Sequence, residues 1–115
     1  MTKAEREARE TVRRRSGGMC ERCGRPGSNI HHRRPRGMGG TTSPEDPTNL
    51  VMLCGSGTTG CHGWVESYRQ RAWEQGWLVP RRDPREPRDV PVYIIGEWWV
   101  LTGDKWEPTD LDPPF

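Results

Sequence analysis

The sequence predicts a small α+β domain that needs a bound metal ion for part of its stability. Only 30% of the 115 residues are apolar, so the hydrophobic core must be thin. Four cysteines occur as two separate pairs, and short apolar runs of strand length alternate with segments of helical composition. Small domains with thin cores commonly depend on disulfides or on a structural metal ion.

The first element is a basic helix in residues 1–18. Residues 2–16 are mainly good helix formers, with Glu and Arg at spacings that allow stabilising pairs. Gly17 and Gly18 then end the pattern. The run from Arg13 to Arg15 either contacts a DNA backbone or forms a solvated helix end.

The segment 19–80 is predicted to form the central domain, with two strands followed by a helix. Residues 29–33 and the apolar run 49–54 have strand character, and the Gly- and Pro-rich stretch 35–47 between them predicts a loop. From Cys61 to about Gly76, aromatic residues recur every four to five positions. This spacing predicts one helix whose aromatic face packs in the core.

The segment 81–115 is predicted to be a linker followed by a C-terminal β-hairpin or meander. Residues 79–90 are dominated by Pro, Arg and Asp, which favours an extended segment with no packing of its own. Residues 90–106 have alternating apolar character with Gly-containing turns. We expect the tryptophans there to pack on the core, although stacking on DNA or binding a partner is the alternative.

The cysteine spacing predicts a structural zinc site. Cys20 and Cys23 have the two-residue separation of a metal knuckle, and Cys54 and Cys61 lie thirty residues further on with a glycine-rich link between them. Tetrahedral zinc accepts four thiolates from two such places. Two disulfides or four free buried thiols are the alternatives.

Three histidines are the candidate chemical groups. His31 and His32 are adjacent on a predicted strand, so alternation should give them different roles, one on a metal ion and one in proton transfer. His62 directly follows a predicted zinc cysteine at a helix start. A neutral imidazole is a competent general base near pH 7.

The basic charge lies near these histidines and predicts a nucleic-acid partner. Residues 1–62 carry eleven Lys or Arg against six Asp or Glu, whereas residues 63–115 carry seven against ten. Arginine makes bidentate contacts with phosphate, but a solvated charged surface is the alternative. The charged first sixteen residues do not resemble a secretory signal and no stretch has the length of a membrane span, so we expect a cytoplasmic protein with reduced thiols.

Taken in order, these motifs resemble the HNH endonuclease family with its ββα-metal fold. The resemblance is carried by Cys-x-x-Cys, Ile-His-His-Arg at 30–33, Asn-Leu-Val-Met-Leu-Cys at 49–54 and Cys-His-Gly at 61–63. It covers roughly residues 19–80. The run His-His-Arg-Arg-Pro-Arg-Gly-Met-Gly-Gly is most similar to small HNH proteins encoded by tailed phages of actinobacteria.

The resemblance implies a role for each residue of this chain that matches the motif. His32 would be the general base, while His31 and His62 would bind the catalytic Mg²⁺ or Mn²⁺. Asn49 would tie the loop between the strands and hold the base, unless it is simply a turn residue. Glu66 lies one helical turn after His62 and is either a further ligand or a solvated glutamate.

We expect phosphate contacts from the arginines that follow the histidine pair, although some of these could be plain loop charges: Arg33, Arg34 and Arg36. The implied activity is hydrolysis of double-stranded DNA, most simply nicking, with 5′-phosphate and 3′-hydroxyl products. Phage origin would suggest work with the terminase subunits of DNA packaging. A zinc-dependent nucleic-acid binding module without catalysis, or an assembly protein, is the alternative.

Overall fold

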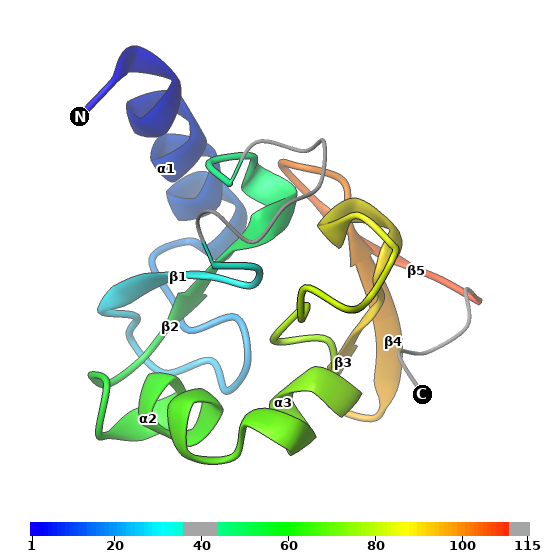
Figure 1. Cartoon of the computed structure of the whole chain (residues 1–115). Helices are drawn as coiled ribbons and strands as arrows, with labels where there is room; N and C mark the ends of the chain where they lie inside the picture. The colour runs from blue at the N-terminus through cyan, green and yellow to red at the C-terminus, as the bar shows by residue number, and fades with distance from the viewer. Residues whose placement is uncertain (36–43, 111–115) are drawn as a thin grey trace.

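The computed structural model describes residues 1–35 and 44–110, and these form helices around two small antiparallel sheets (Figure 1). The α+β class and the strand–strand–helix order of the central segment are as expected. The elements in chain order are α1 (Lys3–Ser16), β1 (Asn29–His32), the 3₁₀ turn η1 (Pro47–Asn49), β2 (Leu50–Leu53), α2 (Gly60–Ser67), α3 (Arg69–Glu74), the 3₁₀ turn η2 (Pro87–Asp89), β3 (Val92–Ile94), β4 (Glu97–Leu101) and β5 (Trp106–Pro108).

Strands β1 and β2 form the hairpin that carries two of the histidines. They pair antiparallel, with His31 opposite Val51 and His32 opposite Leu50. All four residues of β2 are buried, because its two faces meet different partners. One face packs on α1 and the other on the main core, which explains why this strand is a continuous apolar run rather than an alternating one.

Helix α1 covers one face of this hairpin. The Thr2 side chain accepts a hydrogen bond from the Glu5 backbone N–H, and Gly17 ends the helix in the left-handed conformation at φ 63°. Ala8 and Val12, one turn apart, are buried against β2. The helix predicted for residues 2–16 is therefore confirmed.

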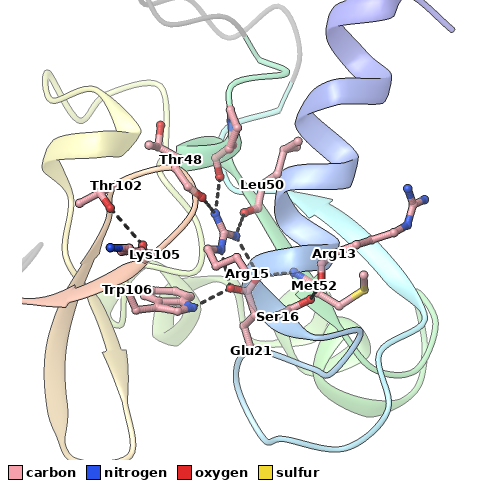
Figure 2. Close-up of polar contacts among 12 residues, drawn as sticks. Arg13, Arg15, Ser16, Glu21, Thr48, Leu50, Met52, Thr102, Lys105 and Trp106 are labelled. Atoms are coloured by element: carbon pink, nitrogen blue, oxygen red, sulfur yellow. Dashed lines mark hydrogen bonds and ion pairs between the residues drawn. The ribbon is translucent and has the colours of Figure 1, made fainter.

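The prediction that the whole Arg13–Arg15 run contacts DNA or solvent is wrong for Arg15. Its guanidinium is buried and forms a two-point ion pair with Glu21, at 2.8 and 2.9 Å (Figure 2). It also donates to the backbone carbonyls of Pro47, Leu50 and Gly103. We call this Arg15–Glu21 pair the buried ion pair.

Glu21 completes the buried ion pair by accepting two further hydrogen bonds. The backbone N–H of Met52 donates to Oε1 and the indole N–H of Trp106 donates to Oε2 (Figure 2). Because each ionised group has several partners, the cost of burying the charges is offset. The pair thereby joins α1, the segment after it, β2 and β5.

The helix predicted from Cys61 to Gly76 is divided in two. Tyr68 has φ −119° and ψ 58°, which ends α2, and α3 begins at the next residue. The expected aromatic core face is confirmed in part: Trp64 and Trp73 are half-buried and pack against the core, whereas Tyr68 is exposed. The fully buried part of this core includes Val65, Ala72 and Trp77.

The predicted linker is packed, which corrects the expectation that residues 79–90 have no packing of their own. Val79, Asp83 and Val90 are buried and the segment contains η2. The expected C-terminal hairpin is a three-stranded meander in the order β3-β4-β5. Gly76, at φ 82°, lies so close to the Pro91 carbonyl that a Cβ there would clash, and this contact closes the meander onto α3.

Candidate functional site

The four cysteines gather into one cluster, although they come from three places in the chain. Cys20 and Cys23 lie in the turn after α1, Cys54 follows β2, and Cys61 lies in the first turn of α2. One sulfur from each lies within 4.8 Å of the others, and none forms a disulfide. The Cys23 and Cys54 sulfurs are 3.6 Å apart, close to the roughly 3.8 Å edge of a tetrahedron with Zn–S bonds of about 2.3 Å.

Local backbone contacts hold this cluster in shape. The Cys61 N–H donates to the Cys54 sulfur at 3.3 Å and lowers the pKa of that thiol to about 7, whereas burial raises the pKa of Cys61 to about 12. Arg22 donates to the Cys61 sulfur at 3.3 Å and lies over the Trp64 ring at 3.8 Å. A metal cation bound among the four sulfurs would favour the thiolate form of the cysteines. The four-cysteine donor set therefore fits a structural zinc ion.

The opposite side of α2 contributes to a second cluster, which is made of His31, His62 and Glu66. One donor atom from each lies within 4.8 Å of the other two, and the two imidazole centroids are 5.6 Å apart. His62 Nε2 lies 3.9 Å from Glu66 Oε1, as expected for residues one helical turn apart. The structure thus brings Glu66 to the two histidines that sequence reasoning had paired.

His31 is held as a neutral imidazole. It is 7% exposed and its Nε2 lies 3.3 Å from the Trp77 carbonyl, which can only accept, so this nitrogen carries the proton and Nδ1 keeps its lone pair. Burial, with a smaller effect from His62, lowers the pKa of His31 to about 4. A neutral imidazole fixed by a carbonyl is the usual form of a metal-binding histidine.

The buried atoms of this second cluster fit a divalent cation. His62 Nδ1 is buried and, within the described part of the chain, has no hydrogen-bond partner. A metal ion would satisfy such a lone pair, and imidazole with carboxylate suits Mn²⁺ or Mg²⁺ bound with several waters. The cluster borders an open hollow of about 290 Å³, which leaves room for further ligands.

His32 borders the same hollow but has a different partner. Its Nε2 lies 2.8 Å from Glu45 Oε1, and both side chains are largely shielded from solvent. The two histidines of the pair therefore have separate environments, as alternation along the strand indicates. Sequence reasoning missed Glu45, because a residue thirteen positions away across a loop gives no signal of pairing.

Asn49 links the chain leaving β1 to the chain entering β2. Its Oδ1 accepts from the Arg34 backbone N–H at 2.8 Å, and its Nδ2 donates to the Arg34 and Pro44 carbonyls. It is 1% exposed at the end of η1. The side chain thus ties the base of the loop, while the effect of Asn49 on catalysis stays a prediction.

The prediction that Arg33 and Arg34 bind phosphate does not agree with their burial. Arg33 is fully buried and its guanidinium donates to four backbone carbonyls, those of Thr48, Gly76, Pro87 and Val90. Burial lowers the pKa of Arg33 to about 9. Arg34 is 7% exposed and donates to the carbonyls of Asp83 and Arg85. Arg36 lies outside the described residues.

These two arginines instead fasten the C-terminal segment to the hairpin. The carbonyls that they bind belong mostly to residues 76–90, and sequence reasoning treated residues 79–90 as an extended linker. Composition could not show this role, because a buried arginine that satisfies carbonyls and an exposed arginine look the same in sequence. The packed segment positions Trp77, whose carbonyl holds His31.

A comparison with protein-family models gave a match. Residues 20–63 match the family model described as HNH endonuclease. No curated protein and no solved structure gave a match. In residues 1–35 and 44–110, no helix is both long and apolar enough to cross a membrane. The matched segment runs from the first cysteine to the residue after His62, so this part of the chain is similar to HNH endonucleases.

Proposed function

We propose that this protein is a metal-dependent DNA endonuclease of the HNH type. The observation that carries the proposal is the joint placement of His31, His62 and Glu66 with His32 around one open hollow. The match of residues 20–63 to HNH endonucleases supports the reaction class. A structural zinc ion on the four cysteines would hold the start of α2, and therefore His62, against the hairpin.

His31 and His62 would hold the catalytic ion, with Glu66 as a third ligand. When bound, a divalent cation stabilises the charge of the attacked phosphate and of the departing oxygen. Mg²⁺ is the proposed working ion, with Mn²⁺ as a substitute that suits imidazole ligands better. Among residues 1–35 and 44–110 three protein donors converge, so the remaining positions are open to water and phosphate oxygens.

His32 is the proposed general base. Glu45 accepts the Nε2–H hydrogen bond, so Nδ1 keeps its lone pair and can receive a proton. A water oxygen attacks phosphorus as its proton passes to His32, the bond to the 3′ oxygen breaks, and the departing oxygen takes a proton from solvent water. The products are 5′-phosphate and 3′-hydroxyl ends. One such site per chain cuts one strand, so the expected product is a nick.

Supercoiled-plasmid nicking with Mg²⁺, Mn²⁺ or no added divalent ion tests this proposal. Wild type should nick with either ion, and His32→Ala should lower the rate by about 10²- to 10⁴-fold. Circular dichroism and zinc content must match between the two proteins. A wild type that binds DNA but never nicks would instead support a non-catalytic zinc-dependent binding module.

A role in phage DNA packaging is a further proposal, which is supported by the resemblance of the His-His-Arg-Arg run to phage proteins. It places the chain in the host cytoplasm beside terminase subunits. Co-purification of tagged chain with these subunits from infected cells tests it. If the subunits also co-purify with His32→Ala, binding to them does not depend on nicking. If they co-purify with neither wild type nor His32→Ala, the proposal is contradicted.

A further inference from the structure

Beside the histidine hollow lies a second hollow of about 210 Å³ that the proposed mechanism does not use. It is formed by α3 and by the segment that follows Trp77. The two hollows adjoin, since Pro35, Arg69 and Leu78 line both. Whatever occupies the second hollow therefore lies next to the proposed cleavage site.

Two exposed arginines border this second hollow, namely Arg69 and Arg82. The Arg82 guanidinium lies 4.0 Å from the centre of the Trp73 ring. In the part of the chain that the structure describes, Arg82 has no hydrogen bond or ion pair. A guanidinium stacked on a ring keeps its N–H groups free at its edge, where they can donate in pairs to a phosphate.

Arg69 can reach a phosphate at little cost. Its present partner is Glu66, at 3.1 Å, and the side chains are 55% and 39% exposed. Ion pairs this exposed contribute little to stability, so exchanging the carboxylate for a phosphate is inexpensive. Exchange would also release Glu66 for the metal ion. Arg33 lines the hollow too, but its donors are already engaged by backbone carbonyls.

We propose that this second hollow holds the DNA backbone next to the cleaved phosphate, with Arg82, supported by Trp73, and Arg69 as the phosphate contacts. The inference deepens the proposed nuclease function and rests on it. It gives Arg69 and Arg82 the phosphate contacts that sequence reasoning assigned to Arg33, Arg34 and Arg36. The buried pair could not fill that role without breaking the contacts that hold the C-terminal segment.

The test compares Arg82→Ala and Arg82→Glu with Arg88→Ala and Arg88→Glu, matched changes at an exposed arginine that lines neither hollow. Affinity for a fluorescein-labelled 20-base-pair duplex is measured by anisotropy without added divalent ions, over a range of salt concentrations. Arg82→Ala should weaken binding by about three- to tenfold and reduce the log–log salt slope by about 0.9, the value for one lost phosphate contact. Arg82→Glu should weaken it further.

Nicking measured on the same proteins separates the two proposals. Arg82 variants that bind like the matched Arg88 variants would overturn the subsite, whether or not the wild type nicks. A wild type that never nicks, with binding still lost in the Arg82 variants, would overturn the nuclease proposal while leaving the DNA-binding surface in place. The Arg82 variants should have the melting temperature of wild type, because this side chain is exposed. An unchanged melting temperature shows that any loss of DNA binding does not result from unfolding.

Discussion

The cysteine cluster and the histidine cluster share helix α2 but are built for different purposes. Cys61 and His62 are neighbours in its first turn, yet one side chain is one of four converging thiols and the other is one of three donors beside an open hollow. Four sulfurs can fill the coordination sphere of zinc, whereas three donors leave positions for water and substrate. The two clusters share a helix, so the helix does not distinguish them. They differ in the number of protein ligands and in access from the open hollow, and on these grounds we propose a structural metal site at the cysteines and a catalytic one at the histidines.

Loss of one cysteine should have the largest effect. Cys54→Ser removes one of four zinc ligands, and apparent binding energies of about 10–16 kcal/mol link such sites to folding. We expect loss of zinc and of cooperative unfolding, measured by metal analysis and circular dichroism. Ser56→Ala, a change in the exposed turn nearby, is the control. A folded Cys54→Ser protein that still holds one zinc ion would contradict the framework role.

The buried ion pair should be the next most sensitive part of the framework. Arg15→Met leaves the Glu21 carboxylate buried without its cation, which should lower the free energy of unfolding by about 3–5 kcal/mol. Arg14→Met, an exposed neighbour, should change it by less than about 0.5 kcal/mol. Urea unfolding measures both. If both substitutions change the free energy of unfolding by the same small amount, the buried ion pair does not stabilise the fold.

Disrupting the histidine cluster should leave the fold intact and remove activity. His62→Ala takes away one proposed ligand, so nicking should fall by about 100-fold or more while zinc content and the melting temperature stay near those of wild type. The readouts are plasmid nicking and metal analysis on one preparation. Loss of zinc together with activity would mean that the two clusters are not separate sites.

The contact between Glu45 and His32 should have a smaller effect. Glu45→Gln keeps the size of the side chain but removes the charge that holds the ring, and we expect about a tenfold lower kcat with little change in KM. The matched control is Glu74→Gln on the exposed side of α3. A change in KM alone would indicate that Glu45 acts on DNA binding instead.

Glu66 should contribute least, because two histidines already hold the proposed ion and the carboxylate is also paired with Arg69. Glu66→Gln should weaken Mn²⁺ binding by about threefold, as measured by calorimetry on zinc-loaded protein. An Mn²⁺ affinity equal to that of wild type would contradict the proposal that Glu66 is the third ligand.

The sequence was sufficient for the parts of the fold that local patterns control. The helix of residues 2–16 follows from composition and a terminal glycine, and the two strands were expected at the short segment 29–33 and at the apolar run 49–54. The gathering of four cysteines follows from their pairing in sequence. Each of these depends on neighbours within one element or on a metal-binding spacing.

Long-range polar contacts could not be predicted. Arg15 and Arg33 look like surface charges in sequence, and only the folded chain shows that backbone carbonyls from distant segments surround them. The linker was misjudged for the same reason, since its packing depends on those carbonyl contacts as well as on two isolated buried valines, Val79 and Val90. The partner of His32 likewise lies thirteen positions away in the chain, and such a separation leaves no local pattern.

The most direct test of the account is a count of metal ions of each kind. Wild type is dialysed to constant zinc content and titrated with Mn²⁺, followed by electron paramagnetic resonance, beside His31→Ala and His62→Ala. We predict that all three proteins retain one zinc ion per chain, and that wild type alone has one weaker, exchangeable Mn²⁺ site. Mn²⁺ binding that survives in both variants, or zinc lost with either histidine, would contradict it.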